Sequence, residues 1–448
     1  MSITHSEHNE HSLRRLHERP QKHLEEWLAV PAHVHHVAHR MANPPIERPR
    51  SREEFRQILH SLEVPGATTV LHDKFGYGVR TDSGGDRLIV VWDAHTEYYS
   101  YQVWHIPSER TKPLSFGPLT YPKYFFPLSP LGLRVNALDI VITQGPDVSP
   151  AACRSVMPGP TLYGGRVLGE DIAVVTTFTP DEHDRERYLV ISPSTTPPDH
   201  LLRIVDAIVR IETYYHLILM QKPIFSSAVD EVHAFEQLHL RQREIITGQL
   251  NESTSASLQR WLNHLTEDLM KVNRLAGRMH YELSAAVPYD KIVKTTMGSL
   301  QEQPLPSCRL LSDYVLGGVT GVAEGYQQLL RRIETLKTGF EGIIAIIRAR
   351  VDLLLEEQNL VLLTSVDQTT KSQAILQHTV EGLSIILIAY YLSGLANYVF
   401  KGLHDMGWIS NATIATAAFV PISVVLSFAL MRLSRRIIEK RLAHKSTD

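Results

Sequence analysis

Histidines concentrated near the N-terminus are the side chains of this sequence best suited to binding a metal. His33, His35, His36 and His39 lie close together in a segment that could form a short helix. In such a helix His35 and His39 would share a face one turn apart, a spacing that suits Zn²⁺, Ni²⁺ or Cu²⁺. No cysteine or carboxylate pattern nearby completes a ligand set. The sequence therefore leaves two interpretations open, a divalent-metal site and solvated or packing histidines, and it predicts no other cofactor.

Two further groups are candidates for a functional site. His95 and Glu97 alternate in a strand-like segment, so both side chains would lie on one face and form a cytoplasmic patch, unless their role is structural. Glu212 and His216 lie one turn apart in a predicted helix, a spacing that a surface hydrogen bond would also explain. Nucleophile-elbow, zinc-protease and phosphate-loop motifs are absent from the sequence. We expect no catalytic residue and no enzymatic activity.

The elements that position these side chains divide the chain into segments of different character. Residues 1–11 are polar and predicted to be disordered. Residues 12–200 contain runs rich in β-branched and aromatic residues, separated by turn residues and mixed with helical patterns. The predicted fold class is α+β, with a mixed α/β N-terminal domain that ends near a proline pair, Pro197 and Pro198.

Residues 201–378 have helical periodicity throughout and are predicted to form a helical bundle or stalk. Apolar side chains recur there at steps of four and three, at Leu329, Ile333, Leu336, Phe340, Ile343, Ile347, Val351 and Leu354. Such a seam is typical of a helix that packs along others at a shallow angle. It fits either a bundle within one chain or a coiled coil between chains.

Two apolar stretches, at about 382–400 and 408–431, are each long enough to cross a bilayer as a helix. They predict a transmembrane hairpin over 379–432, against the alternative of a buried hairpin in a soluble protein. A basic tail, 433–448, follows the second stretch. Lys and Arg beside a span stay on the cytoplasmic side, so we expect two passes through the inner membrane and both termini in the cytoplasm. The residues expected at the membrane interface are Lys401, Trp408, Arg432, Arg435 and Arg436.

The first stretch carries small and polar residues within the predicted membrane region. Tyr390, Ser393, Gly394 and Asn397 could line a pore, or they could serve close packing and hydrogen bonding between helices. Helix packing is the more modest interpretation, because the stretch contains no carboxylate to relay protons or cations.

Composition limits the partners and the compartment. With 45 basic and 48 acidic residues, the chain gives no reason to expect nucleic acid as a partner. Its only cysteines, Cys153 and Cys308, form no motif and fit a reducing compartment. The sequence near Met1 contains no apolar segment, so we expect no cleaved secretory signal.

Several separated motifs resemble an uncharacterised bacterial family of predicted membrane-anchored proteins, the domain of unknown function 3422. They start at Leu16, Trp92, Arg210, Glu282, Glu356 and Thr379, and read LHERP, WDAHTEY, RIETY, ELSAA, EEQN and TVEGLS. The last continues into Tyr390-Tyr391 and Gly394-Leu395. The resemblance spans nearly the whole chain, and it implies architecture and anchoring without implying an activity.

The predicted layout is also distantly similar to CorA-type divalent-cation channels, in which an α/β domain precedes a long helix and two spans. Those channels carry Gly-Met-Asn at the end of the first span, whereas this chain has Lys401-Gly402-Leu403 and Asp405-Met406-Gly407 there. Ion selectivity by that filter is therefore in doubt.

Two functions remain after these observations. We expect a non-catalytic oligomeric scaffold or sensor, anchored in the lipid bilayer, with its large domain in the cytoplasm and with stalk and spans forming a homo-oligomer. The alternative is a divergent CorA-like transporter or channel for divalent cations. A small ligand of the cytoplasmic domain cannot be named from the sequence.

Overall fold

The computed structural model describes residues 20–109, 116, 132–145, 149–169, 172–193 and 196–445. The tail expected to be disordered, 1–11, lies outside them. The chain divides into two compact units, one formed by Met1–Gln249 and Asn263–Ile344 and the other by Leu250–Leu262 and Ala345–Asp448. Each unit is described by itself.

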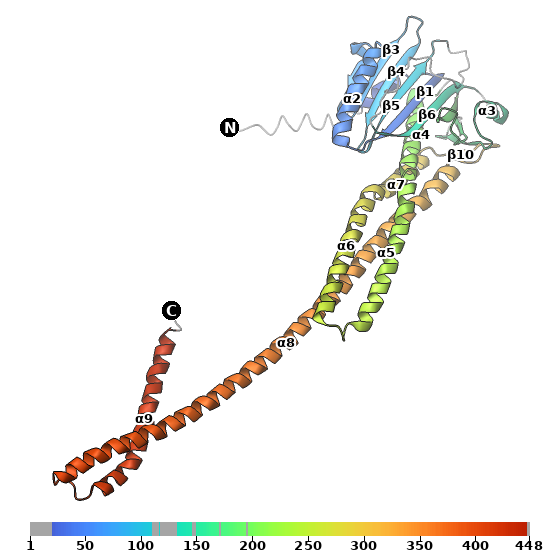
Figure 1. The fold of residues 1–448 in the computed structure, drawn as a ribbon. Helices are drawn as coiled ribbons and strands as arrows, with labels where there is room; N and C mark the ends of the chain where they lie inside the picture. The colour runs from blue at the N-terminus through green and yellow to red at the C-terminus, as the bar shows by residue number, and fades with distance from the viewer. Residues whose placement is uncertain are drawn as a thin grey trace, which may run out of the picture. The chain divides into compact units, whose positions relative to one another are not determined.

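A mixed sheet is the centre of the first unit (Figure 1). Its strands are β1 (Ala32–Arg40), β2 (Thr69–Leu71), β3 (Phe75–Thr81), β4 (Arg87–Ala94), β5 (Tyr98–Ile106), β6 (Leu133–Gln144), β7 (Tyr163–Val167), β8 (Ile172–Thr176), β9 (Glu186–Ser192) and β10 (Gln303–Pro304). They are ordered β10-β7-β8-β9-β6-β1-β5-β4-β3-β2. Every neighbouring pair is antiparallel except β6 with β9. Strand β1 therefore lies in the interior of the sheet, paired with β5 and β6.

Helix α2 (Pro44–Ser61) covers one face of the sheet. Two prolines, Pro44 and Pro45, open the helix, where a missing N–H costs no hydrogen bond. Phe55, together with Ile58 and Leu59, packs on a buried cluster that contains Val37 and Trp92. Because each buried side chain of this size contributes about 1.5–3 kcal/mol, this contact fixes α2 to the strands. Short helical segments at η1 (Pro20–Trp27), η2 (Gly66–Thr68) and α3 (Pro150–Val156) lie outside the sheet.

Helix α4 (Pro198–Leu219) packs on the sheet through a second apolar cluster. Leu217 joins Ala38, Tyr98 and Val135 there. The Asn136 side chain of β6 also donates a hydrogen bond to Thr213 Oγ1 at 3.1 Å. Since Val37 and Ala38 are consecutive in a strand, they point to opposite faces. Strand β1 is thus covered on both sides, and the predicted α+β class is confirmed.

After α4 the chain continues into α5 (Lys222–Gln249), α6 (Ser255–Leu283), α7 (Ala286–Ser299) and α8 (Leu311–Asp405). The seam predicted from the sequence is buried from Leu329 to Ile347 within this single chain. Contacts with α5 illustrate the packing: the Arg332 guanidinium pairs with Glu236 at 2.7 Å, and the Phe340 ring lies 4.9 Å from the His239 ring. For these residues the seam belongs to an intrachain bundle, while a coiled coil between chains stays a prediction.

The second unit contains the two apolar helices. The final part of α8 and helix α9 (Ala412–Lys445) are long and apolar enough to cross a membrane. Only 6% and 11% of the most apolar stretches of these two helices are buried. A buried hairpin in a soluble protein would require both helices to lie in the core of the chain, and neither does. Helix α9 begins later than expected, because Trp408 lies in the turn, with its N–H bonded to the Leu403 carbonyl.

The basic residues expected as a separate tail, 433–448, instead continue helix α9 as far as Lys445. Arg432 is exposed on this helix, and the side chains of Arg435 and Arg436 lie outside the described set. The final residues, 446–448, lie outside the described range as well.

Candidate functional site

The four clustered histidines lie on strand β1, so the expected short helix is wrong. The segment is covered by two helices and is paired with a strand on each edge, and these contacts stabilise an extended backbone. They do so although apolar and polar residues do not clearly alternate along the segment. His35 and His39 are four strand residues apart, about 13 Å at 3.3 Å per residue, too far to share one ion. His36 points to the opposite face. His39 stacks on Tyr99, with ring centroids 5.4 Å apart.

What the sheet does bring together is His33, His35 and Asp139, called here the β1–β6 cluster. Asp139 is the register partner of His35 across the β1–β6 ladder. Asp139 Oδ1 accepts a hydrogen bond from His33 Nε2 and lies 3.6 Å from His35 Nδ1. The two imidazole rings are 4.2 Å apart. All three residues are buried, and His35 Nε2 and Asp139 Oδ2 have no hydrogen-bond partner among the residues that the structure describes.

A second group joins Glu186 of β9 with Glu212 and His216 of α4, called here the β9–α4 cluster. His216 Nε2 lies 3.4 Å from Glu186 Oε1, and His216 Nδ1 donates to the backbone carbonyl of Glu212 at 2.8 Å. The Tyr188 hydroxyl donates to the Glu212 carboxyl group. Glu212 is 1% exposed, so the interpretation of Glu212 and His216 as a surface pair is wrong.

The two clusters differ in their protonation. Burial lowers the pKa of His35 to about 3, and repulsion from His33 adds to it, so His35 is neutral at neutral pH. Burial acts in the same direction on His216, but the hydrogen bond and charge of Glu186 outweigh it and raise its pKa to about 9. Burial and the charge of Glu186 raise the pKa of Glu212 well above its ordinary value. The β9–α4 cluster therefore contains an imidazolium–carboxylate pair, and its second carboxyl group, Glu212, binds a proton more tightly than usual.

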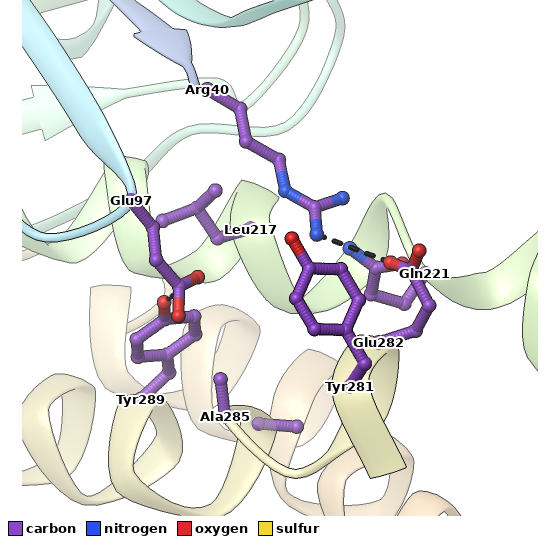
Figure 2. A pocket seen from close by; sticks show the side chains of 9 residues that line it. Arg40, Glu97, Leu217, Gln221, Tyr281, Glu282, Ala285 and Tyr289 are labelled. Atoms are coloured by element: carbon purple, nitrogen blue, oxygen red, sulfur yellow. Dashed lines mark hydrogen bonds and ion pairs between the residues drawn. The ribbon is translucent and has the colours of Figure 1, made fainter. Parts of the chain in front are cut away.

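A pocket lies where the sheet meets the helices, and Figure 2 shows its lining side chains. It is called here the junction pocket. Its lining consists of Arg40, Glu97, Leu217, Gln221, Tyr281, Glu282, Ala285, Ala286 and Tyr289. Arg40, the last residue of β1, pairs with Glu282 of α6 at 3.1 Å. The Tyr289 hydroxyl of α7 donates to Glu97. The polar contacts of the pocket thus tie the sheet to α6 and α7.

The Gln221 amide bridges the same ion pair. With its oxygen toward Arg40 it accepts a hydrogen bond of 2.7 Å from Nη1, and its nitrogen donates to Glu282 at 3.3 Å. The pocket also adjoins a group of aromatic rings. The centroid of the Tyr214 ring lies 4.9 Å from that of Tyr289 and 5.8 Å from that of Tyr98.

Three of the separated sequence motifs converge at this junction. WDAHTEY contributes Glu97, RIETY contributes Tyr214 and ELSAA contributes Glu282. The sequence reasoning missed Arg40, Gln221 and Tyr289, because no local spacing connects them to these motifs. The motifs themselves were the available signal, although they do not reveal which residues meet.

The patch expected from His95 and Glu97 is a turn, and the assignment of the two residues to a strand is wrong. Strand β4 ends at Ala94 and β5 begins at Tyr98. The His95 ring stacks on Tyr98 at 4.4 Å and its Nε2 lies 3.0 Å from Asp93 Oδ2. Only Glu97 reaches the junction pocket.

Polar residues of the first apolar helix contact the second within the hairpin. Ser393 Oγ lies 2.8 Å from Ser423 Oγ, and Asn397 accepts a hydrogen bond of 3.1 Å from the Thr416 hydroxyl. Tyr390 is 73% exposed. A Cβ atom added at Gly394 would meet no atom within 4 Å. Lys401 lies exposed near the end of α8.

Comparisons with known proteins give a family and little else. Residues 8–438 match the family described as protein of unknown function (DUF3422). No curated protein matches the chain. Among solved structures, the complete structure of the CorA magnesium transporter from Methanocaldococcus jannaschii is similar at 10% sequence identity, over 66% of this chain and 90% of that chain. Its TM-score of 0.14 is too low to carry an argument.

Proposed function

We propose that this chain, which belongs to the DUF3422 family, is a two-pass protein of the bacterial inner membrane that works as a non-catalytic sensor or scaffold. Both termini and the sheet face the cytoplasm in this proposal. The excess of Lys and Arg after the second apolar helix supports this orientation, since positive flanks remain cytoplasmic.

The observation that carries the proposal is the continuity of helix α8. Its 95 residues begin beside the sheet and end as the first apolar helix, without a break. Near its start, the Tyr314 ring stacks on Phe178 at 4.0 Å, and the Tyr326 hydroxyl donates to the Ile218 carbonyl at 2.9 Å. A helix held at both ends by packing transmits a displacement better than a flexible linker does, which suits a sensor.

The junction pocket supports the sensing role. Arg40 ends strand β1 and Glu97 lies in the turn between β4 and β5, while Glu282 belongs to α6 and Tyr289 to α7. Helix α7 contacts α8, because Asp290 accepts a hydrogen bond of 3.3 Å from the Thr320 hydroxyl. Since these contacts are an ion pair and a charged hydrogen bond, a change in strand β1 would alter the seating of α6 and α7. The pocket is the place where a ligand signal in the sheet would reach the helical part.

Packing, rather than conduction, is the role that we propose for the polar residues of the hairpin. Ser393 and Asn397 already have partners on the second helix of the same chain. In hydrocarbon such bonds stabilise helix association by about 0.6–2 kcal/mol each. A cation pathway would need these groups to face water instead.

A homo-oligomer is proposed through an exposed stripe of α8. The stripe runs at alternating steps of four and three through Leu355, Asn359, Leu362, Val366, Thr369, Gln373, Leu376, Val380 and Leu383. Its apolar members are all more than half exposed. The period is that of a coiled coil, and a polar residue such as Asn359 at a core position sets register. A second copy of this chain offers the same stripe and is the partner we propose.

Topology is tested with reporters on the full chain. Green fluorescent protein fused after Asp448 is expected to fluoresce, and alkaline phosphatase at the same place to be inactive, with the protein in the membrane pellet after alkaline extraction. The opposite reporter pattern, or recovery in the supernatant without detergent, would overturn the proposal. Selective uptake of a divalent cation into proteoliposomes, lost in Asn397→Leu, would favour the channel.

The oligomer is tested by disulfide cross-linking in membranes. Leu362→Cys on the stripe is expected to form a cross-linked dimer upon mild oxidation. Thr364→Cys, rotated by about 200° on the same helix, is the matched control and should remain uncrosslinked. Equal cross-linking at both positions, or none at either, would contradict a partner chain on this stripe.

A further inference from the structure

We propose that the β1–β6 cluster, formed by His33, His35 and Asp139, is a binding site for a divalent transition-metal ion. The three side chains each offer a ligand atom, and these atoms lie within 4.8 Å of one another. The proposal concerns the sheet alone, so it stands whether or not the chain crosses a membrane.

The geometry is close to that of a bound ion. Two ligands of a tetrahedral metal at about 2.0–2.1 Å are about 3.3 Å from each other. His35 Nδ1 and Asp139 Oδ1 are 3.6 Å apart, so they need little movement to hold an ion between them. The hydrogen bond between His33 and Asp139 would open, its proton leaving as the metal enters.

The electrostatic setting of the cluster also favours a cation. Asp139 is fully buried, and within the described part of the chain its Oδ2 has no hydrogen-bond partner, which is costly for a carboxylate. His35 is 2% exposed, and no described residue offers its Nε2 a hydrogen bond either. An ion with two positive charges would compensate the carboxylate.

Two neighbouring cationic or titratable groups must be considered. Arg185 lies close enough to influence His35, but its guanidinium pairs with Asp181 at 3.1 Å. His105, the register partner of His33, lies 3.6 Å from Asp86. Each of the two thus has a carboxylate of its own, and Asp139 remains available to the ion.

The donor set selects the class of metal. Imidazole nitrogens with one carboxylate suit Zn²⁺, Co²⁺ or Ni²⁺, whereas Mg²⁺ and Ca²⁺ prefer oxygen ligands alone. Three protein ligands leave the fourth tetrahedral position for water or an exogenous group. His33, with a side chain that is 9% exposed, is the route by which the cluster reaches solvent.

The test uses the full chain in detergent, purified through a tag without histidine and stripped with a chelator. We expect Co²⁺ to bind at one ion per chain with the visible absorption of four-coordinate cobalt, and Zn²⁺ to displace it. His35→Gln and Asp139→Asn are expected to weaken Zn²⁺ binding by at least about 100-fold, more than loss of an outer-shell partner does.

Two controls make the assignment specific. His36→Gln changes the next residue of the same strand, on the opposite face, and His216→Gln removes the histidine of the β9–α4 cluster. Both should bind Zn²⁺ as the unmodified chain does. Failure of the unmodified chain to bind, retained binding in His35→Gln, or equal loss in a control would overturn the proposal. If a buried variant does not fold by near-ultraviolet circular dichroism, His33→Gln replaces it, with the same expected loss.

Discussion

The β1–β6 and β9–α4 clusters contain the same kinds of side chains but hold their protons differently. Both bring histidine and carboxylate ligand atoms within 4.8 Å of one another. In the β9–α4 cluster both ring nitrogens of His216 face acceptors, so both carry protons and neither can ligate a metal. In the β1–β6 cluster His35 is neutral, and one of its ring nitrogens has no partner in the described ranges of the chain.

This difference shows that proximity of ligand types does not make a metal site. What matters is whether the donor electrons are already used by protons. In the β9–α4 cluster both nitrogens of one histidine are directed at oxygen acceptors, whereas in the β1–β6 cluster two histidines face one carboxylate and His35 Nε2 has no acceptor among the described residues. The β9–α4 cluster is therefore a structural ion pair between strand β9 and helix α4, and the β1–β6 cluster is the ligand site.

The largest expected effect is acid destabilisation of strand β1. Burial lowers the pKa of His35 and His36 to about 3 and of His39 to about 4, from 6.5. Below pH 6.5 the unfolded chain binds protons that the folded strand does not. The free energy of unfolding therefore decreases by about 1.4 kcal/mol for each histidine and for each unit by which the pH is lowered. Urea denaturation followed by tryptophan fluorescence measures this slope. His36→Leu should make it shallower, and an unchanged slope would contradict the assignment.

Removal of Glu212 is expected to have the next largest effect. Glu212→Ala leaves the buried Tyr188 hydroxyl without its acceptor and creates a cavity, and should cost about 2–5 kcal/mol of unfolding free energy. Glu212→Gln preserves the shape of the protonated acid and should cost only about 1 kcal/mol. Denaturation midpoints of the two variants measure the difference. Equal losses would mean that Glu212 is ionised and that the contrast between the clusters is mistaken.

Alkaline pH is expected to weaken the β9–α4 cluster and to leave the β1–β6 cluster unchanged. The pKa of His216 is raised from 6.5 to about 9, so its contribution is complete below pH 6.5 and is lost as pH rises through about 9. The loss should be on the order of 3 kcal/mol. His216→Gln should remove this dependence and leave the acid slope of strand β1 in place. A variant that retained the alkaline decline would place the titrating group elsewhere.

The smallest expected effect concerns the junction pocket. Arg40 and Glu282 are partly exposed, so Arg40→Ala should cost only about 1 kcal/mol of stability. Because Arg40 lies on the same strand as His33 and His35 but outside the cluster, Zn²⁺ affinity should not change. Calorimetric titration of this variant separates the roles of the two ends of β1. A large loss of Zn²⁺ affinity in this variant would mean that Arg40 contributes to metal binding and that the two sites are not independent.

Much of the architecture could be predicted from local patterns of residue type along the sequence. The segments that became β3, β4 and β5 are rich in β-branched and aromatic residues. The seam from Leu329 to Ile347 shows the helical period, and the two apolar helices stand out by length and lack of charge. Strand β1 could not be recognised in this way. Its nine residues show neither period clearly, because both of its faces are buried.

The candidate sites depended on contacts between distant residues. Asp139 is 106 positions from His33, and Glu282 is 242 positions from Arg40. Spacing along the chain carries no information about such pairs, since sheet register and helix packing decide them. The histidines were the correct residue type to consider, but the helical spacing attached to them was wrong.

By itself the sequence determined the two apolar helices and the helical period before them, because those features depend only on the order of side chains along one helix. It also determined that histidines would be plentiful near the N-terminus. Only the tertiary structure decided which histidines meet a carboxylate and which carboxylates keep a proton. Those outcomes depend on strand register and helix packing, which choose the neighbours of each histidine, and on burial. Burial lowers the pKa of His35, whereas Glu186 outweighs burial and raises the pKa of His216.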